Sequence, residues 1–150
     1  MPVRVQTEDF DVGAELVELR HGNAKIGAVA CFIGLVRDLN EDDRIFTMSL
    51  EHYPGMTEKA LENIIALAKQ RWNIDDALVI HRVGTLQPTD QIVLVATSGI
   101  HRGEVFASCE FIMDYLKTQA PFWKKEQTDH GARWVDARDS DDQATRRWQT

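Results

Sequence analysis

The pattern of apolar and polar residues along the chain predicts four β-strands. Residues 27–36 are almost continuously apolar, which is typical of a buried strand. Residues 45–53 alternate apolar and polar side chains, which is the period of a half-buried strand. Two further apolar runs, residues 77–83 and 91–97, are predicted strands joined by a turn that contains glycine and proline.

Three other segments carry apolar residues at helical spacing. Residues 11–19 predict a short helix with one apolar side. A longer helix carries its apolar positions between residues 61 and 72, and Thr57 can cap its start. The third predicted helix runs from about residue 103 to 117, and Pro121 ends it a few residues later.

The order of these elements is α-β-β-α-β-β-α with extra short strands, so the predicted fold class is α+β rather than a repeated βαβ unit. Residues 37–44 are polar and charged and predict a loop, and residues 120–126 look too short and irregular for a long element. Residues 133–137 predict a short strand, and the charged segment 139–147 predicts a surface turn or short helix. The 150 residues fit a single domain, 1–150.

Composition narrows the class of protein. Apolar residues make up 43% and charged residues 27% of the chain, which is ordinary for a globular protein in water. The net charge of −7 disfavours bulk attraction to nucleic acid or to an anionic membrane. The sequence shows no signal-peptide pattern and no apolar run near the ~20 residues of a membrane span. We therefore expect a cytoplasmic protein.

The thiols and imidazoles offer little chemistry of their own. Cys31 and Cys109 both lie in apolar runs, which predicts two small buried side chains with unreactive thiols and no disulfide framework. The five histidines lack the spacing of metal ligands, so no metal site is expected. Glycine-rich phosphate loops and the common hydrolase motifs do not occur.

Two groups of basic residues are candidates for binding an anion. Arg37 follows a predicted strand directly, where a side chain is well placed to meet a ligand, although a solvated loop arginine would look the same. His101 and Arg102 precede the third helix, whose free N–H groups attract anions. The alternative for this pair is that both side chains simply point into water.

A third basic group follows the end of the third helix. Lys117 lies in its last turn, where a cation is favourable for purely electrostatic reasons. Lys124 and Lys125 come after Pro121, so the chain must bend back to bring them near Lys117. Two lysines held close together would lower the pKa of one of them, and a lysine tuned in this way can act as an acid, a base or a nucleophile.

Several strings in this chain resemble the large, catalytic subunit family of molybdopterin synthase, the MoaE family. The resemblance extends over about residues 25 to 148 and is weak in the first 20 residues. The strings are LEHYPGMTEKAL at 50–61, IHRVG at 80–84, SGIHR at 98–102, FIMDYLKTQAPFWKKE at 111–126 and RWVDAR at 133–138.

The resemblance implies an α/β-hammerhead fold and a homodimer that binds one ubiquitin-like small subunit at each end, a heterotetramer in total. The small subunit carries a thiocarboxylate on its C-terminal Gly-Gly tail. The implied reaction is a sulfur transfer to cyclic pyranopterin monophosphate, which forms the molybdopterin dithiolene. No permanently bound cofactor and no metal are implied, and neither nucleic acid nor a membrane is a partner.

The resemblance also implies roles for individual residues. Lys117 and Lys124 match the catalytic lysines, and His101 and Arg102 match positions that reach the substrate phosphate from the neighbouring protomer. Substrate-binding roles are implied for Arg37, His101, Arg102, Lys125, Glu126 and Arg138.

One position departs from the family, and two rival functions remain open. Leu35 stands where the family often has a lysine, on the same strand face as Arg37, so a supporting charge is missing. A non-catalytic module that docks a ubiquitin-like tail would need the same basic residues. A persulfide sulfurtransferase would need a reactive Cys31 or Cys109, whereas a sulfur that arrives on the partner's tail needs neither thiol.

Overall fold

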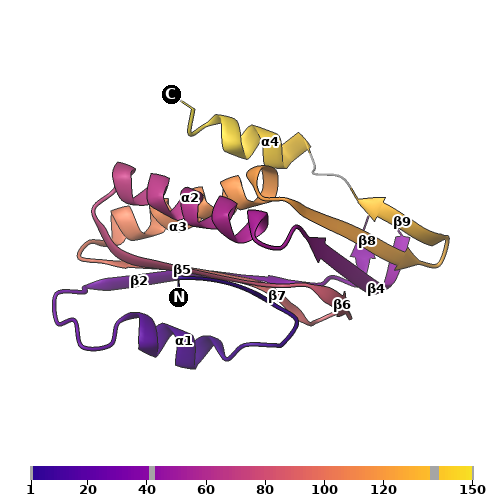
Figure 1. The fold of residues 1–150 in the computed structure, drawn as a ribbon, viewed down its shortest axis with the longest axis horizontal. Coiled ribbons are helices and arrows are strands. Elements are labelled where there is room, and N and C mark those ends of the chain that lie inside the picture. Colours follow the sequence, from indigo (N-terminus) through magenta and orange to yellow (C-terminus); the bar gives the residue numbers. More distant parts are fainter. Residues whose placement is uncertain (1, 41–42, 136–138, 150) are drawn as a thin grey trace.

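The computed structural model describes residues 2–40, 43–135 and 139–149, which form an α+β fold as predicted. Four helices and nine strands occur in these ranges, and Figure 1 shows how they are layered. In chain order the elements are β1 (Val3–Gln6), α1 (Val12–Leu19), β2 (Ala28–Leu35), β3 (Leu39–Asn40), β4 (Asp43–His52), α2 (Met56–Arg71), β5 (Ile74–Arg82), β6 (Gly84–Leu86), β7 (Gln91–Gly99), α3 (Arg102–Gln119), β8 (Phe122–Thr128), β9 (Gly131–Val135) and α4 (Asp139–Arg146).

The first layer is a four-stranded sheet in the order β1-β5-β7-β2, in which only the β1–β5 pair is parallel. Helices α2 and α3 lie on one face of this sheet and α1 lies on the other (Figure 1). Both faces of the central strands are therefore covered, which explains why β5 and β7 read as nearly continuous apolar runs.

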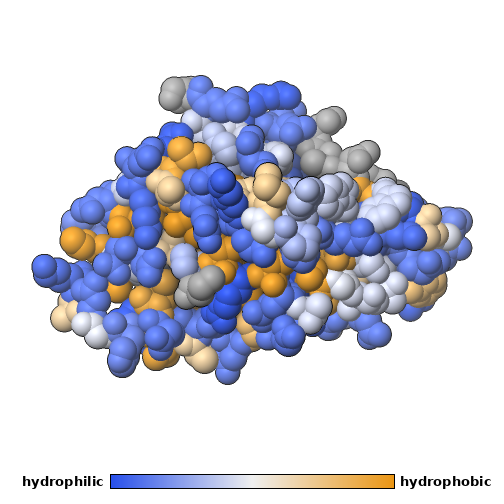
Figure 2. Space-filling view, viewed as in Figure 1, coloured by the Kyte–Doolittle hydropathy of each residue, from blue (hydrophilic) through white to orange (hydrophobic). Residues whose placement is uncertain are grey.

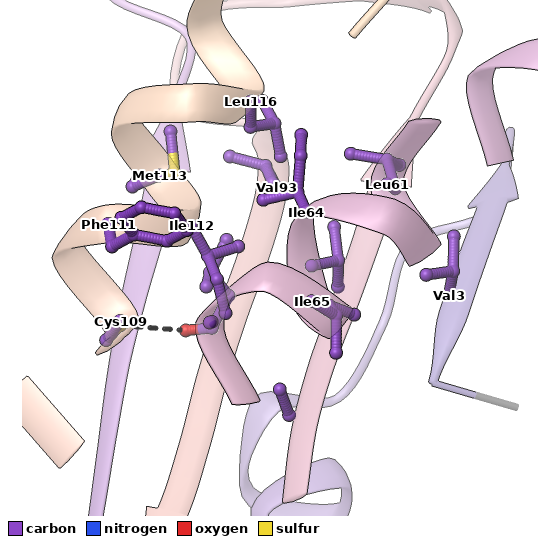
Figure 3. Packing of buried hydrophobic residues seen from close by; sticks show 14 of the residues in the cluster. Val3, Leu61, Ile64, Ile65, Val93, Cys109, Phe111, Ile112, Met113 and Leu116 are labelled. Carbon is purple, nitrogen blue, oxygen red and sulfur yellow. Dashed lines mark hydrogen bonds between the residues drawn. The ribbon is translucent and has the colours of Figure 1, made fainter. Parts of the chain in front are cut away.

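The main core fills the space between α2, α3 and this sheet. Figure 3 shows members of this buried cluster, among them Leu61 and Ile64 of α2, Ile112 and Leu116 of α3 and Val93 of β7. A smaller cluster on the other face packs α1 against β5 and β7. On the face shown in Figure 2 the surface is mostly hydrophilic, with apolar side chains gathered in a band at the level of the sheet.

The second sheet consists of β3, β4, β8 and β9, with β6 pairing to β4. The sequence pattern did not predict β8, which begins at Phe122 directly after Pro121 ends α3. The segment 131–135 is a strand, and 139–146 is a short helix, close to the predicted elements. Within the predicted loop 37–44, two residues pair as β3 and β4 begins at Asp43.

Two local predictions were wrong, one about the burial of a cysteine and one about a helix cap. Strand β2 lies at the edge of its sheet, so Cys31 is exposed, and only Cys109 is the buried thiol that the apolar runs predicted. Thr57 is not the N-cap of α2, because Gly55 occupies that position with a φ of 87° and the Glu58 carboxylate accepts a hydrogen bond from the Gly55 N–H.

Thr57 has a different structural role. Its side chain is fully buried, and its hydroxyl accepts a hydrogen bond from the Tyr53 N–H at 2.9 Å and donates one to the Pro121 carbonyl at 2.9 Å. The start of α2 is thereby tied to the turn between α3 and β8.

Helix α4 and the residues after it pack on α3 through Trp148. The indole ring contacts Trp72 and Phe111, with ring centroids 5.4 and 5.6 Å away. Its Nε1–H donates a hydrogen bond to the Asp114 carboxylate at 2.7 Å, and Arg71 donates to the Trp148 carbonyl at 2.7 Å. None of the helices described here is long and apolar enough to cross a membrane.

Replacing Trp148 with alanine is expected to lower the free energy of unfolding by about 2 kcal/mol, because a partly buried indole and its hydrogen bond are lost. Urea unfolding measures this change, and hydrogen exchange should speed up in residues 139–146 before it does in α3. Trp134→Ala is the matched control, since that ring is 57% exposed and its loss should change stability by only about 0.5 kcal/mol. Equal effects of the two substitutions would contradict the anchoring role of Trp148.

Candidate functional site

A cavity of about 320 Å³ lies where the two sheets meet the C-terminal end of α3. Apolar side chains from β4, β7 and α3 form much of its wall, among them Met48, Leu50, Ile92 and Leu116. The polar lining residues are Arg37, Asn40, His81, Lys117, Lys124, Glu126 and Asp141. Residues separated by more than 100 positions in the sequence therefore contribute to one site.

The break between α3 and β8 brings Lys117 and Lys124 to the same cavity. Helix α3 ends at Gln119, and Ala120 has extended backbone angles of φ −94° and ψ 136°. Because Pro121 cannot continue the helix, the chain bends there and enters β8. Lys117 thus lines the cavity from the last turn of a helix and Lys124 from a strand, which agrees with the bend expected from the sequence.

Alternation along β8 separates its lysines. Phe122, Lys124 and Glu126 line the cavity, as expected for residues two apart on one strand face. Lys125 lies on the opposite face, where its Nζ atom is 5.6 Å from the centre of the exposed Trp134 ring. The structure therefore does not bring Lys125 to the cavity.

Glu126 is a buried carboxylate that lines the cavity, with 1% of its surface exposed. Asn40 donates hydrogen bonds to its two oxygens at 2.9 and 3.2 Å, and the Arg133 guanidinium lies 3.4 Å away. Arg133 also pairs with Asp43 and donates to the Asn40 carbonyl at 3.0 Å. These contacts compensate the burial of a charge, and they tie the segment that carries Arg37 to β8 and β9.

His81 lines the cavity from β5 and is 5% exposed. Its ring stacks on Phe122, with centroids 3.8 Å apart and an angle of 17° between the planes. Burial is the main cause that lowers the pKa of His81 to about 4, and the nearby charges of Lys117 and His52 also lower it. The hydrogen bond to the Arg82 carbonyl acts in the opposite direction and raises the pKa. The imidazole is therefore neutral near pH 7.

His101 and Arg102 lie at the other end of α3 and are exposed. A rise of 1.5 Å per residue places Arg102 about 22 Å along the helix from Lys117. His101 and Arg102 do not line the cavity of their own chain. Leu35 at the end of β2 and Arg37 in the segment after it do line that cavity. Arg138 lies outside the described residues.

One group of side chains in the described ranges has the composition of a metal site. Asp43, Asp129 and His130 bring one ligand atom each within 4.8 Å of the others. The Asp43 carboxylate already pairs with Arg133, and the hydrogen bond from His130 together with this guanidinium lowers the pKa of Asp43. The positive charge of Arg133 disfavours a metal ion there, and the group does not line the cavity.

Sequence reasoning identified the three cationic side chains that line the cavity, but it assigned no role to Asn40, His81 or Arg133. The resemblance strings include His81 and Arg133 without assigning a role to either. Nothing in the sequence pattern indicates that Asn40 meets Glu126, because the two residues are 86 positions apart. The pairing of β4 with both β3 and β8 brings them together.

Comparisons with known proteins find relatives that share one description. The family model described as MoaE protein matches residues 5–119. A molybdopterin synthase catalytic subunit of Ralstonia nicotianae is 66% identical over 146 residues, which cover 97% of this chain and 83% of the relative. A second relative of the same description, from Vibrio cholerae, is 54% identical over 98% of this chain and 97% of its own length.

Two solved structures share the fold. A molybdopterin biosynthesis MoaE protein from Burkholderia ambifaria is 61% identical, with a TM-score of 0.85 over 99% of this chain and 97% of that one. A chain of a Helicobacter pylori complex, described as subunits 1 and 2 of molybdopterin-converting factor, is 21% identical with a TM-score of 0.70 over 93% of this chain and 92% of that one, which supports the fold alone.

The low pKa of His81 predicts a loss of stability in acid. Between pH 6.5 and 4 the unfolded chain binds a proton at His81 that the folded chain does not, so the free energy of unfolding falls as the pH falls. At pH 5 this loss is about 2 kcal/mol. Urea unfolding at pH 7 and pH 5 should show a smaller loss for His81→Phe, while the exposed control His21→Gln behaves like the parent. Equal losses in all three proteins would rule out this account of His81.

Proposed function

The chain belongs to the MoaE protein family, and on that premise we propose that it is the catalytic subunit of a molybdopterin synthase. In the proposed reaction, cyclic pyranopterin monophosphate receives two sulfur atoms, one from each of two thiocarboxylated tails of a ubiquitin-like small subunit. Each tail is left as a carboxylate, and the molybdopterin dithiolene forms. The observation that carries the proposal is the cavity in which Lys117, Lys124 and Arg37 converge.

The charges of the reactants suit this cavity. The substrate phosphate and the thiocarboxylate are both anions, and three cationic side chains line the cavity beside the carboxylates of Glu126 and Asp141. The carboxylate of Glu126 is offset by Arg133 and Asn40. The protein can therefore hold two anionic reactants despite its net charge of −7.

In this proposal Lys117 and Lys124 are the catalytic residues. One lysine assists ring opening and loss of water by proton transfer, and the other holds the partner's tail, either by charge as an ammonium group or covalently after losing its proton. The apolar side chains of Met48, Leu50 and Leu116 limit water in the cavity and thereby strengthen these interactions.

A second copy of the chain is proposed to complete the site. Helix length puts Arg102 about 22 Å from Lys117 of the same chain, so His101 and Arg102 would reach a substrate phosphate only in a neighbouring protomer. The proposed assembly is a homodimer with one small subunit at each end. The Helicobacter pylori structure, described as a complex of two subunits, is consistent with such a partner.

The remaining predicted substrate-binding residues differ in how well their positions suit that role. Arg37 and Glu126 line the cavity and remain proposed substrate-binding residues. Lys125 faces away from it, so the proposal gives Lys125 no contact with a substrate inside the cavity. Leu35 lines the cavity as an apolar residue, which leaves Arg37 as the cation at this end of β2.

The positions of the two thiols argue against a persulfide mechanism. Burial, together with Cys31 and Glu110 nearby, raises the pKa of Cys109 to about 12, which suppresses its thiolate. Cys31 is exposed on β2, and neither thiol lines the cavity. Sulfur delivery by the partner's tail requires neither of them.

The test is product formation by this protein with a thiocarboxylated small subunit and cyclic pyranopterin monophosphate. Lys117→Ala is expected to lower the rate by about 100-fold or more, because proton transfer in the cavity is lost. Binding of the small subunit, measured by calorimetry, should be unchanged. Lys69→Ala is the control, since Lys69 is exposed on α2 and pairs with Asp76 at 3.4 Å.

The other outcomes distinguish the rival functions. A parent protein that binds the small subunit but forms no product would support the docking module. Loss of binding without loss of turnover per complex in Lys117→Ala would assign that lysine to docking rather than to catalysis.

A further inference from the structure

Strand β2 forms an open edge of its sheet. It pairs with β7 on one side, and no strand in the described ranges pairs with its other side. Cys31 is exposed on this strand, and Phe32, Ile33 and Leu35 are exposed by 42%, 37% and 52%. So many exposed apolar side chains along one edge are typical of a surface that binds another chain.

The sequence of β2 does not protect this edge. Edge strands usually carry charged residues or proline, which prevent another strand from adding to the sheet. The strand, with the sequence AVACFIGL, contains neither. Its pairing with β7 is irregular only between Gly34 and Leu35, at the end of the strand. The regular part of β2 can therefore accept a further strand.

The start of β2 lies beside the segment that leads into His101. Ala28 pairs with Gly99, and the Gly27 N–H donates a hydrogen bond to the Gly99 carbonyl at 2.9 Å. The Ile100 carbonyl lies so close to Gly27 that a side chain at this glycine would clash with it. His101 and the N-terminus of α3 are therefore held at the start of β2.

The cavity of the same chain lies at the opposite end of β2. Leu35 and Arg37 line it, and the length of the strand puts Leu35 about 23 Å from Ala28. Along α3, Arg102 lies about 22 Å from Lys117. Both routes separate the basic pair at the start of α3 from its own cavity by a similar distance.

We propose that β2 pairs antiparallel with β2 of a second copy, and that this interface brings His101 and Arg102 to the cavity of that copy. The inference rests on the proposed function, in which a second copy completes the site. Antiparallel pairing about a twofold axis sets the start of one strand opposite the end of the other. Because neighbouring strands are about 4.8 Å apart, Gly99 then lies about 10 Å from the end of the second copy's β2.

A second copy suits this edge better than a strand of the small subunit does. The strand carries no charge, so two chains that each have a net charge of −7 meet there without placing like charges opposite each other. A strand of the small subunit would also cover the apolar side chains, but it would leave His101 and Arg102 far from a cavity. Self-pairing covers the edge and supplies both residues to a site.

Sedimentation velocity tests the interface without substrate or small subunit. The parent protein should sediment as a dimer, with twice the 17.1 kDa of one chain. In Phe32→Lys, two ammonium groups meet near the twofold axis, so the dissociation constant of the dimer should rise about 100-fold or more. Leu67→Lys is the matched control and should stay dimeric, because Leu67 is also exposed but lies on α2, which packs over β1 and β5. A monomeric parent, or a Phe32→Lys variant that is folded by circular dichroism and dimerises like the parent, would overturn the proposal.

Cys31 provides a second test in the parent protein itself. It is the exposed thiol, whereas Cys109 is buried. Residues that lie opposite or diagonal to each other on paired strands are about 5 to 8 Å apart, so a short bismaleimide should join Cys31 of the two copies into a covalent dimer. Cys31→Ser should give no such product. A dimeric parent that is not cross-linked at Cys31 would place the interface elsewhere and reject the pairing of β2.

Neither test depends on turnover. A parent protein that dimerises and cross-links as expected but forms no product contradicts the proposed function and supports the interface. A parent protein that forms product as a monomer, or as a dimer joined elsewhere, supports the proposed reaction and contradicts the interface.

Discussion

The geometry of the cavity depends on one constraint, the abrupt change from helix to strand between residues 119 and 122. Pro121 cannot continue α3, and the buried hydroxyl of Thr57 fixes the Pro121 carbonyl at 2.9 Å. Without this bend, Lys124 would continue past the end of the helix, away from Lys117. The bend instead brings both lysines to the cavity, Lys117 from α3 and Lys124 from β8.

Alternation along β8 then gives the strand two faces with different properties. One face carries Phe122, Lys124 and Glu126 toward the cavity, and the other carries Lys125 beside Trp134. Burying Glu126 is tolerated because Asn40 and Arg133 bond to it, which also fixes the segment that carries Arg37. The support for the site is therefore built from polar contacts that cross from β3 and β9 to β8.

Much of the fold was predictable because an element with one buried face carries apolar residues at the regular spacing of a helix or a strand. Helices α2 and α3 and strands β5 and β7 were confirmed, since each packs an apolar face or is covered on both sides. Strand β8 was missed because its inward face includes Lys124 and Glu126, so the apolar alternation of a strand is absent. The apolar run of β2 suggested full burial, but a sequence run does not reveal that a strand lies at a sheet edge.

Some residues of the candidate site could likewise be predicted from the sequence, and others could not. Its cations stand out in the sequence as charges beside element ends, and the family resemblance adds expected roles for them. Asn40, His81 and Arg133 act through contacts between distant parts of the chain, such as the pair of Asn40 and Glu126 at a separation of 86 residues. Contacts of this kind follow from strand register, which a single sequence does not reveal.

The proposed function requires that His101 and Arg102 of a second copy complete each cavity. The most direct measurement co-expresses Lys117→Ala and Arg102→Ala chains, each with its own affinity tag, and assays the purified mixed dimer. A shared site predicts that the two inactive chains together regain roughly half of the parent dimer's activity, because one of the two sites in a symmetric dimer is then intact. A mixed dimer as inactive as either variant alone would contradict the account.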